Sequence, residues 1–225
     1  MMDETREIRS LEFEIRAEDQ EGEARGGRLT GTPIVFGQVT DMGWYREKIS
    51  ADALKNTDLK DVRFLIGHNT SMVPLARSRN NNKNSTMQMT VTERGMEIRV
   101  DLDIENNPEA KTLYSAVKRG DITGMSFMFT VAKDSWDDID TDMPTREILS
   151  IRKVYEVSAV AFPAYEGTDL QAASEGGTLD SVRASLESAR KQLEEDREAA
   201  AREERRRAVL DWWENYTKEG KGHEA

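Results

Sequence analysis

The chain changes character near Ala172, and this break constrains its fold more than any other feature of the sequence. Before Ala172, short apolar and alternating segments are interrupted by Gly, Pro and Asn, a pattern typical of strands joined by turns. After it, Ala, Glu, Arg and Lys dominate and proline is absent, which is typical of a long exposed helix. We therefore expect a folded domain over residues 1–172, a linker over 173–178 and a charged helical tail over 179–225.

Within the first part, the spacing of apolar residues predicts mainly strands. Leu11, Phe13 and Ile15 alternate with charged residues, which predicts one strand. The apolar run 28–38 contains Pro33 and predicts an edge strand or a bulge. The other expected elements are a short capped helix over 50–54, a helix over 107–119 and strands over 62–66, 86–91, 96–102, 122–132 and 147–162. Several short strands with two helices predict an α+β domain that is β-barrel-like and flanked by helices.

Composition excludes several kinds of site and partner. The chain has no cysteine, so disulfides, Cys-based zinc sites and Cys nucleophiles are excluded. Its two histidines are His68 and His223, too few for a metal site built from several imidazoles in one subunit. The net charge of -11 argues against a nucleic-acid partner. The sequence has no Walker or dinucleotide-binding glycine motif, and we expect no cofactor. It has no apolar run of 18 residues and no apolar N-terminal stretch, so we expect no membrane span and no secretion by the usual route.

His68 and Ser126 are the first two candidate catalytic residues. His68 follows the apolar strand 62–66, and a histidine at a strand end can present its ring at a cleft, where it can exchange a proton near neutral pH. On its own, such a histidine is more often a surface or core residue. On the strand 122–132, Ser126 shares a face with Gly124, which leaves room for a substrate backbone, while Met125 and Phe127 point inward. The alternative is an ordinary strand serine.

Glu156 is the third candidate, because it lies within an otherwise apolar strand. A carboxylate in such a strand needs a partner, since burying it unpaired is costly. It could orient an imidazole, as the third member of a catalytic triad does. The alternative is a salt bridge to Arg152 or Lys153, or an exposed position.

The order of these segments carries a resemblance to a known family. A strand ends at His68, a helix spans 107–119, Gly-Met-Ser-Phe-Met-Phe follows at 124–129, and Tyr-Glu-Val-Ser-Ala-Val-Ala-Phe-Pro-Ala-Tyr at 155–165. In this order they resemble the tailed-phage prohead proteases over about residues 8–170. The resemblance implies a fold like that of the herpesvirus assemblins, a β-barrel surrounded by helices. It implies a serine endopeptidase that cleaves capsid protein, its scaffold segment and often itself inside the prohead, in the host cytoplasm.

The resemblance also implies roles for the candidate residues. It implies Ser126 as nucleophile and His68 as base. Assemblins use a second histidine as third member, but His223 lies in the tail, so Glu156 is our choice. Many relatives have His-Asp and Ser-x-Gly-Phe where this chain has His68-Asn69 and Ser126-Phe127-Met128-Phe129, which leaves the shape of the cleft open. Backbone N–H groups near 74–77 or around Ser126 are candidate oxyanion donors.

The tail leaves two interpretations open. It could dock the protease on a helical scaffold and be released by self-cleavage within 172–177, or it could be a solvated tail without a role. A homo-oligomer is compatible with either interpretation. The alternative for the whole chain is a non-enzymatic capsid scaffolding or assembly protein, which needs no special role for Ser126 or His68.

Overall fold

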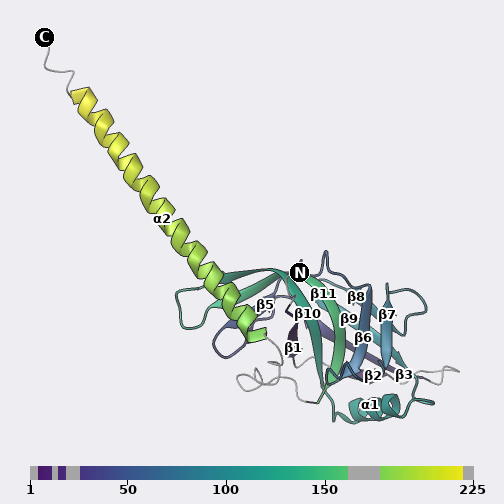
Figure 1. Ribbon diagram of the computed structural model, residues 1–225. Helices are drawn as coiled ribbons and strands as arrows, with labels where there is room; N and C mark the ends of the chain where they lie inside the picture. Colours follow the sequence, from purple (N-terminus) through teal and green to yellow (C-terminus); the bar gives the residue numbers. More distant parts are fainter. Residues whose placement is uncertain (1–4, 12–14, 19–25, 162–177, 220–225) are drawn as a thin grey trace. The chain divides into compact units, whose positions relative to one another are not determined.

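The computed structural model describes residues 5–11, 15–18, 26–161 and 178–219 (Figure 1). The strands form a large sheet of seven strands and a small sheet of four. The large sheet contains β1 (Glu7–Leu11), β4 (Thr40–Asp41), β5 (Arg46–Ile49), β6 (Asp61–Ile66), β7 (Ala76–Arg79), β10 (Gly124–Asp137) and β11 (Thr145–Val160). The small sheet contains β2 (Ile15–Glu18), β3 (Gly27–Val35), β8 (Met87–Val91) and β9 (Gly95–Leu102). The helices are α1 (Pro108–Arg119) and α2 (Thr178–Glu219).

The long antiparallel pair of β10 and β11 organises the large sheet (Figure 1). β1 pairs with the other edge of β10 in antiparallel register. Along its other edge β11 pairs in parallel with two short strands, β5 near its beginning and β6 near its end. The last part of β11 therefore lies between β10 and β6, which brings together segments from three distant parts of the sequence.

One hydrophobic core joins the two sheets. Its fully buried side chains include Leu29 and Met96 from the small sheet and Phe127 and Val157 from the large sheet. Each such side chain contributes about 1.5–3 kcal/mol through burial. α1 packs against the small sheet (Figure 1). The α+β class is thus confirmed, but neither sheet closes on itself in the described part of the chain, so the expected barrel is not formed.

Elements with strong local signals were predicted correctly. The hairpin of β8 and β9 forms as expected. α1 begins after Asn107, whose side chain accepts hydrogen bonds from two backbone N–H groups of the first turn, and it ends at Gly120 in the left-handed conformation. Pro33 lies where the register of β3 against β9 shifts between Gly31 and Ile34, so the bulge interpretation is confirmed.

Two local predictions were wrong. Leu11 and Ile15 do not belong to one strand, because Leu11 ends β1, Ile15 begins β2 and these strands are in different sheets, while Phe13 lies outside the described residues. Residues 51–56 form consecutive turns instead of a helix. The N–H groups of Ala53 and Lys55 donate to carbonyls three residues back, and the carbonyl of Ala53 accepts from the Ile151 N–H of β11 at 2.9 Å.

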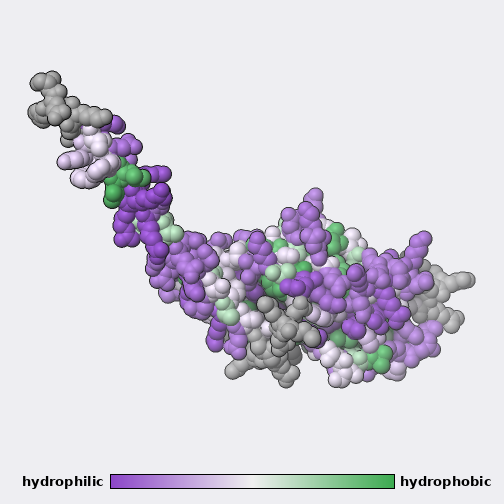
Figure 2. All heavy atoms as spheres, turned by 45° about the horizontal axis from the view of Figure 1, so that its top comes forward, coloured by the Kyte–Doolittle hydropathy of each residue, from purple (hydrophilic) through white to green (hydrophobic). Residues whose placement is uncertain are grey.

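The predicted long helix of the tail is present as α2. Figure 2 shows that most of its surface is hydrophilic, with an apolar patch in its C-terminal half, where Val209, Leu210, Trp212, Trp213 and Tyr216 are exposed. In the described ranges, no helix is long and apolar enough to cross a membrane. The expected linker lies outside the described residues except for Thr178, and the domain boundaries stay a prediction.

Candidate active site

His68 lies in a tight turn directly after β6. Gly67 and His68 both have positive φ angles, 57° and 60°, which reverse the chain immediately after the strand. A non-glycine residue in this region is strained and needs support from its surroundings. The backbone N–H of His68 donates to Oγ of Ser158 at 3.0 Å, and that of Gly67 to the carbonyl of Ala159 at 3.0 Å. The end of β11 therefore fixes the turn that carries the imidazole.

The imidazole of His68 is held by Glu156, as the sequence suggested. Nδ1 of His68 lies 2.6 Å from Oε1 of Glu156, whose side chain is 3% exposed. The alternative salt bridge to Lys153 is not formed, since Lys153 binds Asp58. Because the carboxylate accepts from Nδ1, the proton of the neutral ring lies there and Nε2 is an acceptor. Nε2 is buried and has no hydrogen-bond partner among the described residues.

A β-bulge places Glu156 on the face of β11 that points away from the hydrophobic core. The register against β10 shifts between Met128 and Phe129, which leaves Tyr155 as an extra residue on β11. As a result, Val154 and Val157 both point into the core although they are an odd number of positions apart. Strict alternation from Val154 would have turned Glu156 toward the core.

Ser126 lies one strand away from this pair but does not bind to it. It is opposite Ser158 in the register of β10 and β11, and therefore on the same face of the sheet. Its hydroxyl donates to the carbonyl of Arg9 at 2.9 Å and accepts from Ser10 Oγ at 2.8 Å, both on β1. The inward packing of Met125 and Phe127 is confirmed, but the open space expected on the other face is absent, because Ser126 is 0% exposed.

Ser158 is a site residue that the sequence analysis missed. Its hydroxyl donates to Oε2 of Glu156 at 2.6 Å and accepts the His68 N–H, and it is 0% exposed. It therefore connects the carboxylate to the turn that carries the imidazole. The available signal was its position two residues after Glu156, which puts both side chains on one face of a strand.

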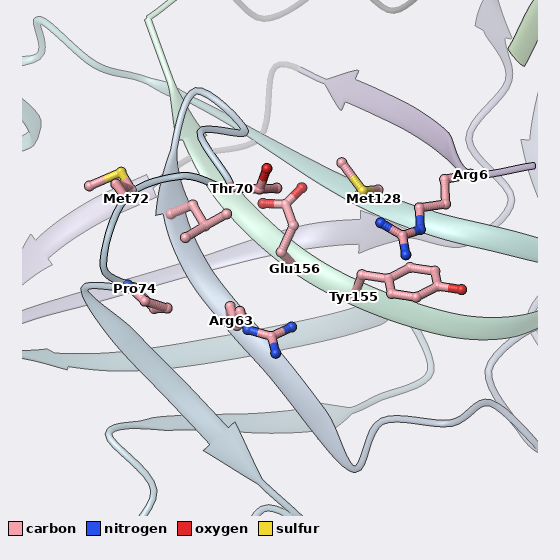
Figure 3. Close-up of a pocket in the computed structure, with 9 residues that line it drawn as sticks. Arg6, Arg63, Thr70, Met72, Pro74, Met128, Tyr155 and Glu156 are labelled. Carbon is pink, nitrogen blue, oxygen red and sulfur yellow. The ribbon is translucent and has the colours of Figure 1, made fainter. Parts of the chain in front are cut away.

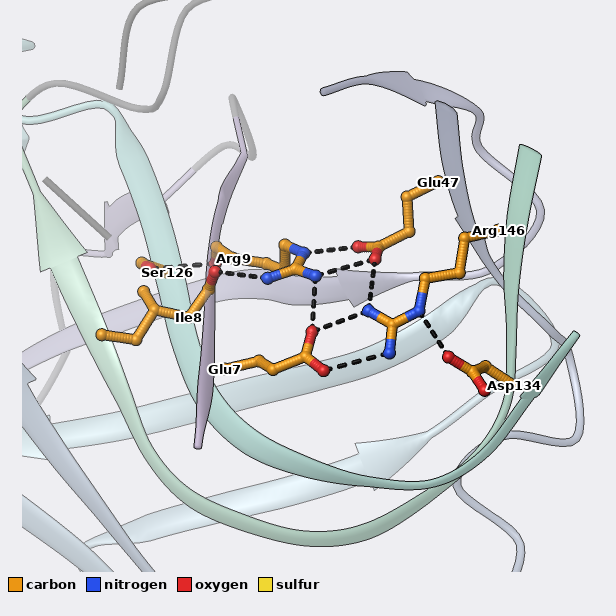
Figure 4. Close-up of polar contacts among 7 residues, drawn as sticks. All are labelled: Glu7, Ile8, Arg9, Glu47, Ser126, Asp134 and Arg146. Carbon is orange, nitrogen blue, oxygen red and sulfur yellow. Dashed lines mark hydrogen bonds and ion pairs between the residues drawn. The ribbon is translucent and has the colours of Figure 1, made fainter. Parts of the chain in front are cut away.

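A buried ionic network beside Ser126 was also missed (Figure 4). Arg9 of β1 binds Glu7 at 2.6 Å and also binds Glu47 of β5. Arg146 of β11 binds Glu7 at 2.8 Å, Glu47 at 3.1 Å and Asp134 at 2.7 Å. Burial raises the pKa of Glu7, but the nearby Arg9 and Arg146 lower it further, so the net shift is downward from 4.5. The network ties β1 to β5 and β11.

The candidate oxyanion donors near Pro74 are largely occupied in this structure. Pro74 has no N–H group, and the amides of Leu75 and Arg77 donate to Phe64 O at 3.0 Å and to Thr86 Oγ1 at 2.9 Å. The amides around Ser126 lie on a strand that is paired along both edges, with β1 and with β11, so they too belong to the sheet, and the oxyanion donors stay a prediction.

Comparison with known proteins gives the family. The family model described as caudovirus prohead serine protease matches residues 11–180. The chain belongs to this family. It is 25% identical over 179 residues to the prohead protease of Enterobacteria phage HK97, covering 78% of this chain and 73% of the relative. No solved structure matches the chain.

Membership of the prohead serine protease family makes the chain a serine peptidase of capsid maturation. The enzyme prediction is thereby confirmed, and the non-enzymatic alternative loses its support. Serine peptidase chemistry is carried by side chains and backbone amides. In the described ranges, no group of three or more His, Cys, Asp or Glu side chains could hold a metal ion.

Proposed function

We propose that Ser126, His68 and Glu156 form the catalytic triad of this prohead protease. The observation that carries the proposal is the state of His68. Glu156 binds Nδ1, which orients the ring, while Nε2 is left as a buried acceptor without a partner. An unsatisfied buried acceptor is costly, and in a catalytic site it is the atom that takes the nucleophile's proton.

We further propose that the described geometry is a resting state. The Ser126 hydroxyl donates to a β1 carbonyl, so its proton points away from His68. Side chains opposite each other on antiparallel strands lie about 5 Å apart, so Ser126 is close to Ser158, which itself contacts both other triad members. Rotation of the Ser126 side chain, with displacement of β1 to admit substrate, would complete the triad.

In the active state each group has a defined role. Oγ of Ser126 attacks the peptide carbonyl carbon while Nε2 of His68 takes the hydroxyl proton. The C–N bond then breaks, and the leaving amine receives that proton. Water, deprotonated by the same nitrogen, hydrolyses the acyl-enzyme and restores the serine. Glu156 keeps the Nδ1 proton in place and stabilises the imidazolium. An oxyanion donor would add about 3 kcal/mol of transition-state stabilisation.

The substrates follow from the family. We propose that the enzyme cleaves capsid protein and its scaffold segment inside the prohead, in the host cytoplasm, and that it also cleaves itself within 172–177, which lies outside the described residues. The polar helix α2 would then be a detachable docking element for a helical scaffold, and a homo-oligomer is compatible with it. The assemblin-like fold stays a prediction.

Co-expression with the capsid protein of the same phage tests the function. We expect the capsid protein to become shorter, with new termini that mass spectrometry can identify. His68→Ala should abolish this change, because it removes the imidazole that Glu156 orients and that is proposed to take the proton from Ser126. His223→Ala is the matched control and should cleave normally. Assembly without any change in size would instead support a scaffold.

Ser158 is proposed as a positioning residue, which Ser158→Ala tests. Loss of a hydrogen bond to a charged group costs about 1.5–3 kcal/mol, so kcat should fall about tenfold to a hundredfold. KM should stay constant, because Ser158 does not contact the substrate. Ser78→Ala is the control, since Ser78 is equally buried and its hydroxyl has no hydrogen-bond partner in the described part of the chain. Equal kcat values for the two variants would contradict the assignment.

A further inference from the structure

A cavity of about 340 Å³ lies beside the His68–Glu156 pair (Figure 3). Its walls come from β6, β10, β11, the loop after His68 and the residue before β1. The lining residues that matter here are Arg6, Arg63, Leu65, Met72, Met128 and Glu156. Because Glu156 belongs both to this wall and to the proposed triad, whatever occupies the cavity lies next to the reacting groups. Its volume is at the small end of ligand sites, suited to a side chain more than to a cofactor.

Two guanidinium groups give the cavity a positive character. Arg6 lies over the ring of Tyr155, 4.4 Å from its centroid, and Arg63 projects from β6 (Figure 3). The one carboxylate in the lining, Glu156, already uses both oxygens, one for His68 and one for Ser158. Glu156 therefore has no free oxygen for a ligand, and its single negative charge is outnumbered by the two guanidinium charges of the lining.

The nearest acid to Arg63 does little to offset its charge. Asp61 lies 3.3 Å from Nη2 of Arg63, but it is bound at 2.6 and 2.7 Å by two nitrogens of Arg77. Arg77 thus neutralises Asp61 in a two-pronged pair. Arg63 keeps donors and positive charge that it can present to a ligand.

The rest of the lining is apolar. Leu65, Met72 and Met128 form a flexible hydrophobic wall beside the arginines. Methionine adapts to irregular shapes, so this wall suits an aliphatic stem. An aliphatic stem that ends in a carboxylate matches both parts, whereas a Lys or Arg side chain would be repelled by the two guanidinium groups.

We propose that this cavity is a specificity pocket for an acidic side chain of the substrate peptide, close to the bond that is cut. The proposal rests on the function proposed above and adds the substrate class. Arg63 binds the carboxylate, and Met72 and Met128 contact the stem. Neither arginine takes part in proton transfer.

Binding can be tested without any cleavage. The probes are the peptides Ac-Ala-Ala-Glu-Ala-Ala-NH2 and its Gln counterpart, titrated into full-length Ser126→Ala protein whose methionine methyl groups carry ¹³C. We expect the Glu peptide to shift the Met72 and Met128 signals and to bind about tenfold to a hundredfold more tightly than the Gln peptide. Arg63→Glu should abolish the difference. Arg79→Glu is the control, because Arg79 is exposed on the neighbouring strand outside the cavity. This variant should retain the difference in affinity between the two peptides.

Cleavage then separates this proposal from the proposed function. A peptide library digested by wild-type protein should show Asp or Glu enriched at one position near the cut, and Arg63→Glu should remove the enrichment while cleavage continues. Equal binding of the two peptides, or no shift of Met72 and Met128, overturns the pocket assignment even if the enzyme cuts. Selective binding without any Ser126-dependent cleavage supports the pocket and overturns the triad.

Discussion

Ser126→Ala should stop cleavage of the co-expressed capsid protein, with a fall in rate on the order of 10⁴-fold or more. The reason is that no acyl-enzyme can form without the Oγ atom, while His68 and Glu156 alone only bind and orient. The measurement is the amount of shortened capsid protein, quantified by mass spectrometry over time. Purified Ser126→Ala should also keep its full length, whereas the wild-type chain should lose its C-terminal tail.

Ser10→Ala is the matched control for this experiment. Ser10 lies opposite Ser126 in the register of β1 and β10, and its hydroxyl donates to Ser126. Ser10→Ala removes a hydroxyl oxygen from the same hydrogen-bonded pair of serines, but it leaves the proposed nucleophile in place. Cleavage should continue at the wild-type rate or faster, because a contact that holds Ser126 in the resting state is lost. If Ser10→Ala abolishes cleavage while Ser126→Ala still cleaves, the two serines have been assigned the wrong way round.

Local signals predicted much of the chain, and its long-range pairing could not be predicted. Asn107 and Gly120 mark the ends of α1 through hydrogen bonds made within a few residues, so sequence alone suffices there. The parallel pairing of β6 with β11 joins segments about ninety residues apart, and nothing near His68 specifies Glu156 as its neighbour. Glu156 was a candidate because it is a carboxylate in an apolar strand, and the resemblance to a family then led to its choice as the partner of His68.

The positions of Ser126 and Tyr155 show a second limit. Alternation along β10 correctly separated Phe127 from Ser126, but it could not reveal that Ser126 is buried and hydrogen-bonded to β1. On β11, the bulge at Tyr155 interrupts the alternation, and bulges have no reliable signal in a single sequence. Ser158 was overlooked because a serine in an apolar strand has the same pattern whether or not it supports a catalytic carboxylate.

The buried ionic network shows that a single sequence also does not reveal which charged side chains are buried. Glu7 and Arg9 alternate with Ile8 and read as the solvated face of a strand, yet both are buried. They are tolerated there because β5 and β11 supply Glu47 and Arg146, which are remote in the sequence. A buried charge of this kind is stable only while its partners are complete. The network is therefore the place where one substitution should affect stability most.

Arg146→Met should lower the free energy of unfolding by about 3–5 kcal/mol at pH 7, since it leaves Glu7 and Glu47 buried with only Arg9 between them. Methionine keeps most of the volume, so the loss reports charge pairing more than packing. The measurement is the urea midpoint of the cleavage-inactive Ser126→Ala protein with and without the substitution. Arg79→Met, at an exposed position, should change the free energy by less than about 0.5 kcal/mol.

The pH dependence of the stability difference between the parent protein and Arg146→Met shows whether charge pairing causes it. The pKa of Glu7 is shifted up by burial but is lowered overall by Arg9 and Arg146, so the folded value lies below 4.5. A lowered pKa contributes stability that is complete above the unfolded value and is lost as the pH falls through the folded value. The gap between the parent and Arg146→Met should therefore be full at pH 7 and narrow as the pH falls toward the lowered pKa of Glu7 in the parent, because Glu7 is protonated first in the variant, which lacks one guanidinium partner. A gap that stays constant down to pH 3 would mean that the substitution acts through packing. The ionic network would then not be what holds β1 in place beside Ser126.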